Sequence, residues 1–139
     1  MRALLLSLVL ITLFSCNSKS PEAMIPYLDG YWEIERVTMP DGSVKEFGMS
    51  GTVDYIAVQG DSGVRKKVVP RLDGSFLVND SAEQFILKLE SDSLHLHYST
   101  PFDQWKESVL QAGDDHLEVL NRDGKRYRYK RYKGLAADK

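Results

Sequence analysis

Cysteine is nearly absent from this sequence, whose single thiol is at Cys16. One cysteine cannot build a disulfide framework, and a lone cysteine in an exported chain is a free thiol that needs an explanation. The sequence also lacks a Gly-rich phosphate loop and a serine in a strand–glycine–helix elbow, so nucleotide-dependent and serine-based catalysis have no support. It has no apolar run of roughly 20 residues, the length that a membrane-spanning helix requires.

A strong excess of charge of one sign is missing too. The 18 basic and 20 acidic residues leave a formal net charge of −2. Removal of an N-terminal signal segment would take one positive charge with it, Arg2, and leave about −3. A nearly neutral exported protein is a poor match for nucleic acid, so we expect no nucleic-acid partner.

The first 15 residues are predicted to be a signal peptide. Arg2 gives them a positive start, and Ala3 to Phe14 form an almost wholly apolar run with the length of a signal-peptide core. The residues from Leu13 to Cys16 resemble a bacterial lipobox, in which the cysteine becomes the lipidated N-terminus. Lipidation explains the lone Cys16, and several acyl chains give a stable anchor. We therefore expect a lipid-anchored protein of the bacterial cell envelope, with residues 16–26 as lipidated cysteine and tether.

After residue 27 the side chains alternate between apolar and polar, and no helical period lasts longer than two turns. In the first strand, Trp32, Ile34, Arg36 and Thr38 are expected on one face. Short turns join the strands and no long crossover connection is present. The sequence therefore predicts an all-β, up-and-down antiparallel meander barrel of about 8–10 strands over residues 27–133, followed by a tail at 134–139. The expected strands cover residues 32–38, 52–59, 64–72, 75–78, 83–90, 94–98, 102–111, 117–121 and 125–133, with a connector or short strand at 44–49.

Gly30-Tyr31-Trp32 matches the Gly-x-Trp motif that opens the first strand of lipocalin-type barrels. In that family the tryptophan sits at the closed end of the barrel, and an arginine from the last strand packs across it. Alternation in the last strand puts Arg131 on the same face as Tyr127 and Tyr129, so the resemblance assigns barrel closure to Gly30, Trp32 and Arg131. A guanidinium over an indole contributes about 0.5–2 kcal/mol. The alternative is that Trp32 is a core aromatic of another β fold.

Charged residues on the strands are interpreted as structural. If the first and last strands pair, Glu33 and Glu35 meet Arg126 and Arg128 as cross-strand ion pairs. The basic run at residues 65–67 is expected on the polar faces of a strand, balanced by neighbouring acids. The alternative is that this run contacts the phosphate head groups of a nearby membrane.

The chain as a whole resembles a group of small lipocalin-like lipoproteins of the Bacteroidota to which no activity is assigned. This resemblance implies a fold and an envelope location, and no reaction. In these lipoproteins an acidic signal just after the cysteine directs surface export, and residues 17–20 contain no acid, so we expect a periplasm-facing protein. The segments that carry the resemblance are Gly30 to Ile34, Pro40 to Gly42, Arg71 to Gly74, Thr100 to Glu107 and Tyr127 to Arg131.

Two histidines could act as metal ligands. His95 and His97 lie on one face of a strand about 6–7 Å apart, which suits Zn²⁺ or Cu²⁺ if a third ligand, such as His116, joins them. The sequence does not fix such a ligand, and two exposed histidines are the preferred interpretation. We expect no metal and no other cofactor.

The barrel interior is the remaining candidate site. We predict a non-catalytic protein that binds a small hydrophobic or amphipathic molecule among inward aromatic side chains. The alternative is an interaction module with a filled barrel, docking another envelope protein through its outer face or its long loops, residues 39–51 above all. The candidate ligand-binding residues are Tyr55, Phe85, Tyr98, Trp105, Tyr127 and Tyr129.

Overall fold

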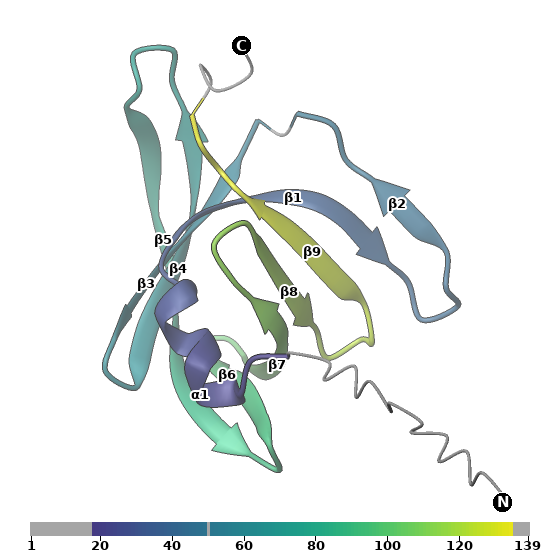
Figure 1. Cartoon of the computed structure of the whole chain (residues 1–139). Coiled ribbons are helices and arrows are strands. Elements are labelled where there is room, and N and C mark those ends of the chain that lie inside the picture. Colours follow the sequence, from purple (N-terminus) through teal and green to yellow (C-terminus); the bar gives the residue numbers. More distant parts are fainter. Residues whose placement is uncertain (1–17, 50, 135–139) are drawn as a thin grey trace, which may run out of the picture.

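The computed structural model describes residues 18–49 and 51–134. The expected signal peptide, Cys16 and the residues from 135 onward lie outside the described part. Within it, two short helices precede nine strands (Figure 1). The elements are α1 (Pro21–Met24), the 3-10 helix η1 (Ile25–Tyr27), β1 (Gly30–Thr38), β2 (Val44–Glu46), β3 (Val53–Gln59), β4 (Ser62–Pro70), β5 (Phe76–Glu90), β6 (Ser93–Ser99), β7 (Gln104–Ala112), β8 (His116–Leu120) and β9 (Arg126–Arg131). No helix among these residues is both long and apolar enough to cross a bilayer.

The strands form one antiparallel sheet that closes on itself. Its order is β2-β1-β3-β4-β5-β6-β7-β8-β9, and β1 also pairs with β9. Since β1 pairs with β3 through its first residues and with β2 through its last, β1 and β3–β9 close the barrel and β2 extends it at one side. The all-β, up-and-down antiparallel barrel predicted from the sequence is confirmed.

The predicted alternation in β1 is wrong after Glu35. Trp32 and Ile34 face the core, but the pairing with β9 shifts between Ile34 and Arg36. This β-bulge turns the following side chains over, so Val37 is buried and Arg36 is exposed. Alternation alone cannot show a bulge, because the extra residue changes the face without changing the composition.

The predicted turn between residues 78 and 83 is also wrong. β5 is a single strand of 15 residues, and the turn-like residues 79–81 lie inside it. They coincide with a register shift against β4, where Lys66 pairs with Ala82 but Val68 pairs with Val78. Polar residues with turn propensity suit such an irregular part of a strand, so their turn signal marks a bulge here.

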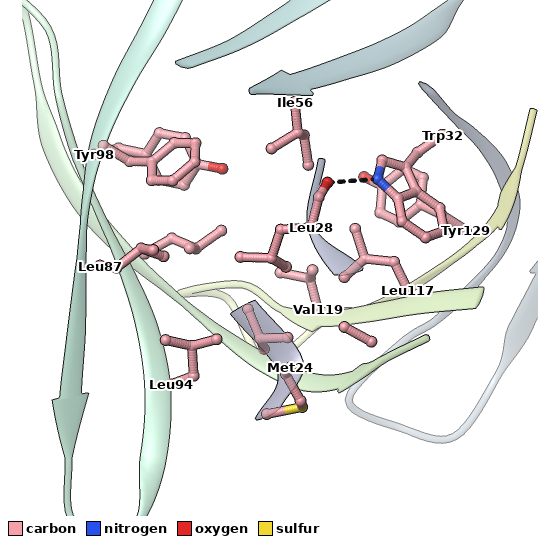
Figure 2. Packing of buried hydrophobic residues seen from close by; sticks show 14 residues of the cluster. Met24, Leu28, Trp32, Ile56, Leu87, Leu94, Tyr98, Leu117, Val119 and Tyr129 are labelled. Carbon is pink, nitrogen blue, oxygen red and sulfur yellow. Dashed lines mark hydrogen bonds between the residues drawn. The ribbon is translucent and has the colours of Figure 1, made fainter. Parts of the chain in front are cut away.

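The segment before β1 belongs to the fold and is not a tether from Pro21 onward. Ser20 Oγ accepts a hydrogen bond from the Ala23 backbone N–H at 3.4 Å, and Pro21 occupies the first turn of α1, where its missing N–H costs nothing. Met24 and Leu28 thereby enter the same core cluster as Trp32, with Leu28 next to the indole (Figure 2). The indole Nε1 of Trp32 donates to the Leu28 carbonyl at 2.9 Å, which satisfies its buried N–H.

Candidate functional site

One end of the barrel is closed by Arg131. Its guanidinium lies 3.8 Å from the centre of the Trp32 ring. Gly30, with φ of +125°, leaves the space that the guanidinium fills, because a Cβ there would overlap Arg131. The Arg131 side chain donates to four backbone carbonyls, those of Tyr27, Asp29, Gly113 and Asp114. These contacts tie the N-terminal segment and the β7–β8 turn together over Trp32 at this end of the barrel.

A cavity of about 340 Å³ lies toward the other end of the barrel. Its volume is at the low end of the range for ligand pockets, which suits one small molecule. Trp105, Tyr127 and Tyr129 form aromatic parts of the wall. Charged residues of both signs line it as well, among them Asp54, Arg65, Lys66, Lys67, Glu83 and Glu107.

Arg65 is the centre of a hydrogen-bond network at this cavity. Its Nη2 donates to Asp54 Oδ2 at 2.8 Å and to the Tyr129 hydroxyl at 2.6 Å. Its Nη1 lies 3.3 Å from both the Tyr98 hydroxyl and Glu107 Oε2. The four partners come from β3, β9, β6 and β7, so Arg65 on β4 links strands on opposite sides of the barrel. Such a network holds the cavity in one shape.

The pKa values of the two carboxyl groups bound to Arg65 are shifted in opposite directions. Burial alone would raise the pKa of Asp54, but Arg65 and Lys67, the latter 3.0 Å from Oδ1, outweigh it and hold that pKa below its usual value. Burial raises the pKa of Glu107, and Arg65 compensates only in part, while nearby Glu83 adds to the rise. Glu107 is thus the less well compensated carboxylate.

Two tyrosine hydroxyls complete the network in their neutral form. Burial raises the pKa of Tyr129 to about 12, and it raises the pKa of Tyr98 as well. Both phenols therefore stay protonated at neutral pH. Since each oxygen accepts a hydrogen bond from Arg65, each hydroxyl can still donate its own hydrogen.

Most of the predicted aromatic residues gather at this cavity. Trp105 is stacked on Tyr98 with ring centres 5.0 Å apart, and Tyr127 is stacked on Tyr129 at 6.5 Å. Phe85 meets the edge of Tyr98 at 5.3 Å and is itself buried in the core. Trp105, Tyr127 and Tyr129 thus line the cavity, Tyr98 reaches it through the Arg65 network, and Phe85 supports Tyr98 from below the site.

Tyr55 is not placed with the others, and its expected inward position is wrong. It lies opposite Tyr31 on the outer face, with ring centres 4.8 Å apart, and Tyr31 is stacked on Phe76 at 4.4 Å. The inward face of β3 instead carries Asp54, which enters the Arg65 network, and Ile56, which enters the core. Hydrophobic patterning places the tyrosine inside and the acid outside, and the structure reverses both.

His95 and His97 lie on the outer side of β6, since Leu94, Leu96 and Tyr98 between and beside them are buried. His95 Nδ1 is 2.9 Å from Ser108 Oγ. His97 Nε2 is 3.3 Å from Glu90 Oε1, without the geometry of a hydrogen bond. No group of three or more potential metal ligands is found among residues 18–49 and 51–134.

Sequence reasoning missed Arg65, Asp54 and Glu107 as site residues. The basic run at 65–67 was expected on solvated faces, but Arg65 points into the barrel. One signal could have found it. Gly63 lies inside β4 where a Cβ would overlap the Phe85 ring, and a glycine within a strand marks such a close approach. Arg65, two residues on, shares the face of Gly63 and therefore faces inward.

No protein-family model matches the chain, and no curated protein matches it. Among solved structures, it is similar to a lipocalin-like protein from Bacteroides uniformis. The two sequences are 12% identical, and the match covers 76% of this chain and 98% of that chain with a TM-score of 0.47.

Proposed function

We propose that this protein binds one small molecule in the Arg65 cavity and acts without catalysing a reaction. The observation that carries the proposal is the cavity of about 340 Å³, whose wall combines aromatic rings with an ordered set of charged groups. Aromatic walls with a few fixed polar groups are the usual composition of small-molecule sites. The opposite end is filled by Trp32 and Arg131, so a ligand enters and leaves through one mouth.

A binding role is supported by how the charged groups are engaged. Arg65 is bound to Asp54 and Glu107, and Asp54 also holds Lys67. Side chains that neutralise one another in this way keep the shape of a site, whereas a general acid or base must reach the reacting atom with its proton. We therefore assign these residues to ligand positioning.

We further propose that the protein is a lipoprotein of the bacterial envelope, periplasm-facing and anchored through Cys16. The support is the lipobox-like sequence that ends at Cys16. Cys16→Ser should remove the anchor, and membrane fractionation should then find the variant in the soluble fraction. Recovery of Cys16→Ser in the membrane pellet at the wild-type level would refute the anchor without touching the ligand site.

The binding proposal is tested by native mass spectrometry of residues 18–139 after incubation with an envelope extract of the host. We expect a bound mass in the small-molecule range on the wild type. Tyr127→Ala, which opens the cavity wall, should lose this mass, and Tyr55→Ala, which removes a tyrosine from the outer face, should keep it. A wild-type protein that stays free of ligand would count against the proposal.

A second candidate function is docking of another envelope protein. It is favoured by three large hydrophobic side chains that stand almost free in solvent on connecting segments, which are Met49, Leu72 and Phe102 with 84%, 97% and 96% exposure. A large exposed hydrophobic side chain can fill a pocket on the surface of a partner protein. Stoichiometric capture of one partner, lost when residues 39–51 are deleted, would support this function for that loop. Capture that survives the deletion would exclude the loop.

A further inference from the structure

We infer that the ligand of the Arg65 cavity is a small, uncharged ring compound with several hydroxyl groups, of the monosaccharide or disaccharide class. This inference rests on the proposed function, since it names the ligand class of the same site. It narrows the hydrophobic or amphipathic ligand expected from the aromatic residues alone to a polar class of ligand. Four properties of the cavity carry it: the filled barrel below it, the polarity of its floor, the balance of its charges and the nature of its wall.

The space that a long apolar ligand would need is filled with side chains. Leu28, Trp32, Phe85, Leu94 and Leu96 have at most 2% of their surface exposed. They belong to one core cluster inside the barrel, and Figure 2 labels Leu28, Trp32 and Leu94 among its members. The ligand therefore remains near the mouth, within about 340 Å³, and is compact rather than elongated.

The floor of the cavity is polar. Arg65 is held there by Asp54, Glu107 and the hydroxyls of Tyr98 and Tyr129. A purely apolar ligand would cover these groups and exclude water without offering hydrogen bonds in return, which is unfavourable. A ligand with hydroxyl groups can both accept a hydrogen bond from Tyr129 and donate one to Glu107, since a hydroxyl has one donor and two acceptor positions.

The charges around the cavity are balanced. The acids Asp54, Glu83 and Glu107 are matched by three basic residues, Arg65, Lys66 and Lys67. A ligand with a net charge would be attracted by the residues of opposite charge and repelled by those of the same charge. An uncharged ligand avoids this loss and still uses the carboxylates and ammonium groups as hydrogen-bond partners, so the lining selects for neutral, hydrogen-bonding molecules.

The wall supplies aromatic rings. Trp105 and Tyr127 both line the cavity. Because Trp105 is stacked on Tyr98 and has the Arg122 guanidinium 5.7 Å from its ring centre, we assign the contact with the ligand's ring to Tyr127. The face of an aromatic ring carries negative partial charge. The C–H bonds of a sugar ring are polarised by the neighbouring oxygens, and they pack on such a face while the hydroxyls point sideways. Asn121, at the same wall, adds an amide that can both donate and accept.

Saturation-transfer NMR and isothermal titration on residues 18–139 test this inference. The probes are glucose, galactose, N-acetylglucosamine and maltose as neutral sugars, with palmitate and 1-anilinonaphthalene-8-sulfonate as apolar comparisons. We expect saturable binding of at least one sugar, weakened at least tenfold in Tyr127→Ala and unchanged in Tyr55→Ala. Thermal unfolding of both variants verifies that the barrel is intact.

Three outcomes would overturn the inference and are distinguishable. Binding of palmitate or the sulfonate that depends on Tyr127, with no sugar bound, would leave the proposed function standing with an apolar ligand class. Sugar binding that Tyr127→Ala leaves unchanged would place the sugar outside this cavity. If neither the wild type nor Tyr55→Ala bound any of the probes, the result would count against the ligand class and against the proposed function together.

Discussion

Asp54 and Arg65 form a buried ion pair inside the barrel, with 2.8 Å between the carboxylate and the guanidinium on the adjacent strands β3 and β4. Of the Asp54 and Arg65 side-chain surfaces only 6% and 13% is exposed. A pair in this position is stabilising only while both partners are present, since each has lost most of its water.

Removing Arg65 should therefore destabilise the barrel strongly. Arg65→Met leaves Asp54 and Glu107 buried without their guanidinium, and we expect the free energy of unfolding to fall by about 3–5 kcal/mol. Lys67→Met removes a mostly exposed partner of the same Asp54 and should cost less than about 1 kcal/mol. Urea unfolding measures both values. Similar losses in the two variants would show that the burial of Arg65 does not determine its contribution to the free energy of unfolding.

Glu107 should make stability depend on pH in the direction opposite to Asp54. Because the fold raises the pKa of Glu107, its contribution is full below the unfolded-state value near 4.5 and is lost as pH rises through the folded-state pKa. Glu107→Gln keeps an acceptor for Arg65 and cannot ionise, so it does not undergo this loss. The free energy of unfolding of the variant, relative to that of the wild type, should therefore be more favourable at pH 7 than at pH 4. Urea unfolding at both pH values measures the difference. An equal effect at the two pH values would contradict the raised pKa.

Asp54 contributes stability on the alkaline side of its titration. The fold lowers the pKa of Asp54, so its contribution is present above the unfolded-state value of 3.8 and disappears as pH falls through the lower folded-state pKa. Asp54→Asn should therefore destabilise at pH 7, and the difference from wild type should shrink below about pH 3.8. Unfolding curves recorded by circular dichroism across this range measure it, and a difference that does not shrink would argue against the ion pair as its cause.

Gly30 should tolerate no side chain. In Gly30→Ala the methyl group would meet the Arg131 guanidinium, and the residue would keep φ near +125°, which L-residues rarely adopt. We expect a loss of about 2–4 kcal/mol, the strain of roughly 1–3 kcal/mol being increased by displacement of Arg131. Gly42→Ala is the matched control, since Gly42 also has positive φ and has no atom near its added Cβ. Equal losses in the two variants would mean that Arg131 does not need this space.

Met24 tests whether α1 is part of the folded domain. Met24 is buried in the main core cluster, so Met24→Ala should cost about 2–5 kcal/mol in thermal or urea unfolding. Glu22→Ala, on the exposed side of the same helix, should change stability by no more than about 0.5 kcal/mol. A neutral Met24→Ala would return residues 21–26 to the tether that the sequence suggested.

Regular strands could be predicted from the sequence, and irregular ones could not. In β6 the alternation of Leu94, Leu96 and Tyr98 with two histidines is uninterrupted, and burial follows it throughout. In β1 and β5 the register shifts against a neighbouring strand. A register shift is decided by the pairing of two strands, which a pattern along one strand does not contain.

The site residues also include some that the sequence predicts and some that it does not. Tyr127 and Tyr129 were expected at the barrel interior because β9 is regular up to Arg131. Arg65 was expected in solvent, because a charge on a strand is normally placed there, and its inward position depends on Asp54, Glu107, Tyr98 and Tyr129 from four other strands. Only the closed barrel brings these partners together.

The position of α1 sets how the barrel would be oriented at a membrane. The chain enters the barrel at the end closed by Trp32 and Arg131, where Arg131 holds the Tyr27 carbonyl at 3.1 Å. The described chain begins at Ser18, two residues after Cys16 in the sequence. With the proposed lipid on Cys16, the closed end would lie toward the bilayer surface. The mouth with the Arg65 cavity would then point away from the lipid into the aqueous compartment, where a water-soluble ligand diffuses.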